Sequence, residues 1–135
     1  MAEGIDSLVL DVKCGLGAFM KTEAEARQLA ESLVAISARM GKPTSAILTR
    51  MDEPLGHMIG NSLEVIESID CLKGKGPSDL MEVTYALSAE MLILGGIEST
   101  QEGAMTALKG AINSGAALES FRALVEAQGG DGAVV

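Results

Sequence analysis

The sequence predicts an α/β fold with a partial parallel or mixed sheet, flanking helices and a helix-rich second half. Two observations predict it. Two short, β-rich apolar runs, at 7–13 and 44–50, enclose one helical pattern, and the rest of the chain carries helical periodicity. A strand–helix–strand order makes the two strands parallel, with a right-handed crossover. The chain has 135 residues, 47% of them apolar, which is enough for one domain with a sizeable core.

The first half is expected to be one β–α–β unit. The strand at 7–13 ends in a glycine-rich turn. Thr22 then opens a helix, with Glu25 placed for a capping box. Gly41 ends this helix, and the run at 44–50 is the second strand. The face of the helix that carries apolar spacing consists of Ala26, Leu29, Ala30, Leu33, Ser37 and Met40.

Four helices are expected in the second half, because apolar residues there recur at helical spacing between glycine and proline stops. They cover 61–72, 78–94, 100–115 and 117–128. Asn61 is the expected cap of the first of them. The expected buried face of the second consists of Leu80, Val83, Leu87 and Met91. Residues from Gly129 onward are expected to fray.

Composition excludes several classes of function. A net charge of −9 argues against binding to nucleic acid or to an anionic membrane. No signal peptide is visible, and Glu90 interrupts the longest candidate for a membrane span. Cys14 and Cys71 lie far apart without a metal-type spacing, so we expect free thiols. The sequence therefore predicts a cytoplasmic protein without nucleic-acid or membrane partners.

The glycine-rich turn at 14–18 is the first candidate site. Gly15 and Gly17 lack a Cβ, so their backbone amides can approach an anion or another chain segment closely. The third glycine of a dinucleotide fingerprint is missing, because position 20 is Met. Three interpretations stay open: an ordinary strand-to-helix turn, a phosphate or nucleotide cradle, and a metal contact.

The loop at 52–58, between the second strand and the next helix, is the second candidate site. Pro54 and Gly56 bend it, which also suits a solvated turn. His57 is the only histidine and has no partner at triad or metal spacing, so it is expected at the surface. The acidic residues of the following helix have a spacing typical of a solvated face. They are Glu64, Glu67 and Asp70.

Four sequence blocks, taken together and in this order, resemble the pyrimidine-nucleoside phosphorylases, the family that includes thymidine phosphorylase. The blocks are Asp11–Met20, Met51–Glu67, Asp70–Leu80 and Ala127–Asp131. The resemblance covers nearly all of this chain but a much smaller part of the family's length. It implies that residues 1–135 form a single partial domain, the central portion of the family's large α/β domain. We therefore expect an incomplete chain, through an internal start, a truncated gene or an incomplete sequence.

The resemblance implies a pentosyltransferase. Its reaction would be the reversible phosphorolysis of thymidine, uridine or deoxyuridine to the free base and a pentose 1-phosphate. Inorganic phosphate would be the co-substrate, and the intact enzyme would be a homodimer. The family's phosphate and pyrimidine ligands fall upstream of this chain, so we expect no catalytic or substrate-binding residue within it. Lys13 is accordingly interpreted as structural, and the isolated chain is expected to be inactive.

The resemblance also implies one metal site. A potassium ion would be held by the backbone oxygens of Leu55 and Met58 and by the carboxylate of Glu67, a set of hard oxygen ligands. Its partner ligands in the family come from an upstream glycine-rich segment that these 135 residues do not contain. Two alternatives belong to other classes. One is a non-catalytic α/β relic or partner-binding module, and the other is a nucleotide-binding domain that uses Gly15 and Gly17.

Overall fold

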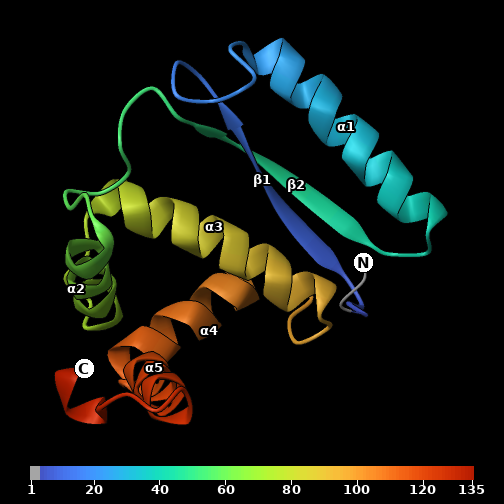
Figure 1. The fold of residues 1–135 in the computed structure, drawn as a ribbon. Helices are drawn as coiled ribbons and strands as arrows, with labels where there is room; N and C mark the ends of the chain where they lie inside the picture. The colour runs from blue at the N-terminus through green and yellow to red at the C-terminus, as the bar shows by residue number, and fades with distance from the viewer. Residues whose placement is uncertain (1–3) are drawn as a thin grey trace.

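The computed structural model describes residues 4–135 as one sheet with five helices and a short 3-10 helix (Figure 1). The elements in order are β1 (Leu8–Cys14), α1 (Glu23–Arg39), β2 (Thr44–Arg50), α2 (Asn61–Leu72), α3 (Ser78–Leu94), α4 (Gln101–Asn113), α5 (Ala116–Ala127) and η1 (Gly132–Val134). The strands pair in parallel, with Leu8 opposite Thr44 and Cys14 opposite Arg50. The predicted α/β class and the parallel β–α–β unit are confirmed.

Helices cover both faces of the sheet, as a parallel sheet requires. Figure 1 shows α1 along one side of the two strands and α3 along the other, and both helices contact both strands. The core between the sheet and α1 contains Val12, Ala26 and Ala30. Partly buried side chains that surround these three are Leu10, Cys14, Met20, Ala46 and Leu48. The even-numbered residues of both strands therefore face α1.

The predicted capping box at the start of α1 is present. The Glu25 amide donates to Thr22 Oγ1 at 3.3 Å, and the Thr22 amide donates to Glu25 Oε2 at 3.0 Å. Hydrogen bonds from the backbone and the hydroxyl of Thr22 hold the pKa of Glu25 below its ordinary value. At the other end, Gly41 adopts φ +70°, a left-handed conformation that ends the helix.

The four helices of the second half exist close to their predicted bounds. Figure 1 shows α4 and α5 on the side of α3 that is away from the sheet, with α4 against α3 and α5 against α4. Thr100 caps α4, because its hydroxyl accepts from the Gly103 amide at 3.1 Å. No helix in residues 4–135 has both the length and the apolar content that a membrane crossing requires.

Some local predictions were wrong. Gly60, with φ +123°, precedes α2 as its cap, and Asn61 is already helical. Met91 of α3 is 56% exposed. Met40, which follows the last residue of α1, is exposed to a similar extent, and Leu29 of α1 is somewhat less exposed. These three side chains therefore lie outside the buried faces. The end of the chain is ordered because Arg122 Nη1 donates to the Gly132 carbonyl at 2.6 Å. A contact between residues ten positions apart leaves no periodic signal in the sequence.

Candidate functional site

The loop between β2 and α2 presents three successive amides to carboxylates of two different helices. The Gly56 amide donates to Asp79 Oδ2, at the start of α3, at 3.0 Å. The amides of His57 and Met58 donate to Glu67 Oε1 and Oε2, on α2, at 2.9 and 3.4 Å. The loop conformation is thus held by side chains that follow it in the sequence.

Glu67 is a buried carboxylate, with only 6% of its surface exposed. Glu67 therefore departs from the solvated face that the spacing of the α2 acidic residues suggests, because the loop folds over the helix at this position. Gly56 has φ +75°, and a Cβ at this position would overlap the Glu67 carboxylate. Glycine is required there both for the backbone conformation and for the close approach.

Asp79 is exposed and acts through hydrogen bonds. The Gly56 amide, followed by the Leu80 amide, lowers the pKa of Asp79 below its ordinary value, and His57 nearby lowers it further. Asp79 is therefore ionised at neutral pH and accepts a charge-assisted hydrogen bond from the loop. No pattern in the sequence marked Asp79 as a contact of the loop. Its position in the first turn of a helix after Pro77 suggests interaction with the helix dipole and gives no sign of the loop.

The three residues predicted to hold a cation line one groove. Leu55, Met58 and Glu67 border a cavity of about 320 Å³. The other lining residues are Pro54, Ile59, Glu64, Ser68 and Leu80, so no lysine or arginine reaches it. Within residues 4–135, Glu67 forms no ion pair. Glu67 and Met58 also line a neighbouring groove that contains His57 and Lys75. On the side of the first groove, a buried carboxylate that accepts only amide hydrogen bonds is a favourable environment for a cation.

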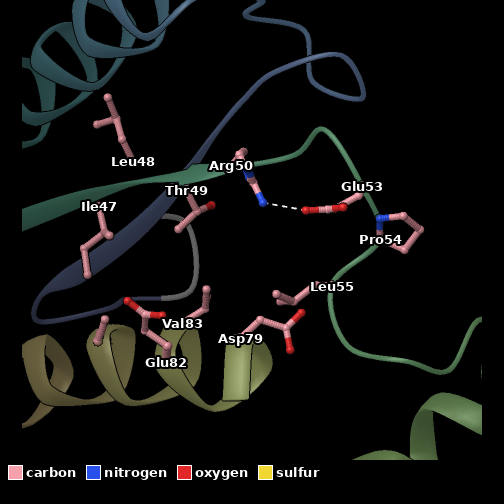
Figure 2. A pocket seen from close by; sticks show the side chains of 11 residues that line it. Ile47, Leu48, Thr49, Arg50, Glu53, Pro54, Leu55, Asp79, Glu82 and Val83 are labelled. Atoms are coloured by element: carbon pink, nitrogen blue, oxygen red, sulfur yellow. Dashed lines mark hydrogen bonds and ion pairs between the residues drawn. The ribbon is translucent and has the colours of Figure 1, made fainter. Parts of the chain in front are cut away.

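A second groove lies on the other side of the loop, between the edge of β2 and α3. Its volume is about 350 Å³, and four consecutive residues of β2 line it together with α3. Figure 2 shows Leu55 and Asp79 at one end of this groove and the ion pair of Arg50 with Glu53 above them. That pair joins at 2.5 Å, with both side chains about 70% exposed, so it is a solvated surface pair of little energetic weight.

The glycine-rich turn has its amides occupied by the protein itself. The amides of Gly15 and Ala18 donate to the carbonyls of Met20 and Gly15, at 3.0 and 3.1 Å. The Leu16 amide donates to Asp52 Oδ1 at 2.8 Å, and the Gly17 amide donates to the Met51 carbonyl at 2.7 Å. Four successive amides are thus directed to internal acceptors, which supports the ordinary turn over a phosphate cradle.

The glycines of this turn are explained by contact with the start of the β2–α2 loop. A Cβ at Gly15 would lie 2.5 Å from Asp52 Oδ1, and a Cβ at Gly17 would lie 2.8 Å from the Met51 carbonyl oxygen. Each distance is too short for a real side chain. The two glycines therefore allow two chain segments to meet closely. This is the approach to another chain segment that the sequence offered beside the approach to an anion.

The other residues that the sequence singled out, two of them charged or titratable and two of them cysteines, show no sign of a ligand site. Lys13 pairs with Asp11 at 2.7 Å, and His57 is exposed. Cys14 and Cys71 are free thiols, as expected, and burial, with smaller effects of Glu67 and Asp70, raises the pKa of the Cys71 thiol. The described residues contain no group of three histidine, cysteine or carboxylate side chains suited to a metal ion.

The parallel β–α–β unit, with a carboxylate-held loop after the carboxyl end of β2, is typical of α/β proteins that bind ligands at that end of the sheet. Residues 1–118 match the family described as the glycosyl transferase family, a/b domain. The chain belongs to this family.

Several curated relatives align with the whole chain. Pyrimidine-nucleoside phosphorylases of Staphylococcus aureus strains USA300 and NCTC 8325 are each 49% identical over 135 residues, and that of the bovine strain RF122 is 48% identical. Each alignment covers 100% of this chain and 31% of the relative. The chain thus spans about a third of the length of these relatives.

Proposed function

We propose that this chain is the central portion of the α/β domain of a pyrimidine-nucleoside phosphorylase. The observation that carries the proposal is 49% identity over all 135 residues to proteins of that name. The whole enzyme would transfer a pentosyl group from a pyrimidine nucleoside to inorganic phosphate. The quoted sequence blocks also support a homodimeric, cytoplasmic enzyme that acts on thymidine, uridine or deoxyuridine.

In this reaction the bond between the anomeric carbon and the base nitrogen breaks, and a bond from the same carbon to a phosphate oxygen forms. The transition state carries positive charge on the sugar, so catalysis depends on placing the phosphate and stabilising the departing base. Neither task falls to the residues described. The occupied amides of the glycine-rich turn, at Gly15 to Ala18, support this division. The chain would contribute the sheet and the ordered loop beside it.

The same proposal includes a potassium site formed by the carbonyl oxygens of Leu55 and Met58 and by the Glu67 carboxylate. Two observations support the fit. The three residues line one groove without a basic side chain, and Glu67 is buried without an ion pair within residues 4–135. Each Glu67 oxygen accepts one amide hydrogen bond and keeps a further lone pair that can coordinate a cation. A bound cation would offset the negative charge of the buried Glu67 carboxylate. It would also order the loop, because the loop carbonyls would coordinate it.

A chimaera tests the proposed activity. This chain would replace the aligned segment, 31% of the length, of the Staphylococcus aureus USA300 phosphorylase. We expect the chimaera to release base from thymidine or uridine only when phosphate is present, and the isolated 135-residue chain to release none. A folded chimaera without phosphorolysis would favour the alternative, a non-catalytic α/β module. Turnover by the purified isolated chain would instead place substrate ligands within it.

Glu67→Gln tests the cation site in the same chimaera. The substitution preserves volume and one oxygen but removes the charge that would offset potassium. We expect the half-saturating potassium concentration to rise about tenfold, which corresponds to about 1.4 kcal/mol. The control is Glu31→Gln, which removes an equal charge from an exposed position on α1. An unchanged potassium requirement together with unchanged thermal stability would refute the role of Glu67.

A further inference from the structure

The Asp79 carboxylate controls the orientation of one peptide group in the loop. It accepts the Gly56 amide hydrogen at 3.0 Å. No described peptide bond is cis, and in a trans peptide the carbonyl of the preceding residue points opposite to the amide hydrogen. The Leu55 carbonyl oxygen therefore points away from Asp79. Fixing the Gly56 amide fixes the direction of a carbonyl that is a proposed potassium ligand.

The position of Asp79 in the fold makes it a rigid anchor. It lies in the first turn of α3, a helix of 17 residues that packs against both strands. Glu67 belongs to α2, which makes no substantial contact with the sheet. The two carboxylates consequently hold the same three-residue stretch from two helices, and of these two helices α3 is the one that packs on the sheet.

We propose that Asp79 is a positioning residue of the loop, which orients the Leu55 carbonyl for a monovalent cation without touching the cation. The inference rests on the potassium site of the proposed function. Asp79 borders the β2–α3 groove and not the groove of Leu55, Met58 and Glu67. Asp79 therefore does not contact a cation in that groove, and its hydrogen bond to Gly56 connects it to the Leu55 carbonyl through one peptide group.

The test uses the same chimaera as the phosphorolysis assay and potassium chloride as the probe, with choline chloride at matched ionic strength. Thermal unfolding gives the potassium concentration at half-maximal stabilisation, and amide hydrogen exchange reports on residues 56–58. Asp79→Ala removes the acceptor, and we expect the half-maximal potassium concentration to rise at least fivefold while the three amides exchange faster. Asp79→Asn keeps an oxygen acceptor and should restore most of both properties. Glu82→Ala removes an equal charge one turn further along α3, where no hydrogen bond to the loop exists, and should change neither.

The outcomes separate this inference from the function on which it rests. A potassium-specific stabilisation that Asp79→Ala leaves unchanged would overturn the role of Asp79 and leave the cation site standing. The same loss in Glu82→Ala as in Asp79→Ala would reduce the effect to general electrostatics and overturn the positioning role. A chimaera that responds equally to potassium and choline would overturn the cation site, and with it any role of Asp79 toward a cation. The phosphorolysis assay on the chimaera stays independent of all three results.

Discussion

Two loops of the chain differ in the acceptors that their successive amides meet. In the glycine-rich turn the acceptors are mostly carbonyl oxygens, with Asp52 as the one carboxylate. In the β2–α2 loop all three are oxygens of Glu67 and Asp79. The second arrangement concentrates negative charge where backbone carbonyls are also available. At the residue scale this difference explains why the β2–α2 loop, and not the glycine-rich turn, is the better candidate for a charged ligand.

Gly56→Ala measures how closely the loop packs on Glu67. Gly56 has φ +75°, and an added Cβ would meet the carboxylate. The left-handed conformation costs an alanine about 1–2 kcal/mol. Displacing Glu67 would cost about 1 kcal/mol more, because the His57 and Met58 amides lose their acceptor. The measurement is the free energy of unfolding from urea denaturation.

Gly41→Ala is the matched control. Gly41 has φ +70° and open space within 4 Å of an added Cβ, so only the conformational cost applies. Equal destabilisation by the two substitutions would show that the loop moves away from Glu67 without loss.

At the scale of the elements, the sequence predicted the type and order of the two strands and the five α-helices. It did so because the signals are local: the capping box of Thr22 and Glu25, the glycine stop at Gly41 and the helical spacing of apolar residues. The burial of Glu67 and the contact of Asp79 with Gly56 depend on residues 10 to 23 positions apart in the chain. No periodicity encodes such contacts. Sequence similarity, and not the residue pattern itself, pointed to Glu67.

Thr22→Ala tests whether the capping box fixes the start of α1. The substitution removes the acceptor of the Glu25 amide and the partner of the Glu25 carboxylate. Loss of such a cap costs about 1 kcal/mol, within a range of about 0.5–2 kcal/mol. Urea denaturation, with circular dichroism as the signal, measures this loss.

Thr106→Ala is the control for that substitution. Thr106 is exposed in the middle of α4, and its hydroxyl bonds back to the Glu102 carbonyl of the same helix. Alanine has the higher helix propensity, so the change should be neutral or slightly stabilising. A Thr22→Ala chain as stable as the unaltered one would show that packing of the helix on the sheet alone fixes its start.

At the scale of the whole molecule, the described region has a two-stranded sheet and exposed apolar side chains. No third strand pairs with either outer edge within the described residues, and only the end of β1 is bridged, by Met20 at Cys14. The Leu8 amide donates to the Pro43 carbonyl, and the Met51 amide donates to the Cys14 carbonyl. The even-numbered residues of β1 therefore direct their backbone amides and carbonyls toward β2. The odd-numbered residues direct theirs to the outer edge. Along that edge lies a groove with Phe19, whose side chain is 98% exposed. Such an edge readily pairs with another chain.

The isolated chain is expected to associate through this edge, despite a net charge of −9. Val9→Pro removes a donor that faces outward and leaves the pairing with β2 intact, since proline is tolerated on an edge with its nitrogen toward solvent. We expect a folded chain whose self-association, measured by sedimentation velocity over a concentration series, is at least about tenfold weaker, or about 1.4 kcal/mol. Leu10→Pro is the control. It removes a donor that faces β2 and should abolish the native circular dichroism spectrum. A folded Val9→Pro chain that associates as strongly as the unaltered chain would show that the contact forms elsewhere, and a monodisperse unaltered monomer would show that the chain closes its own core.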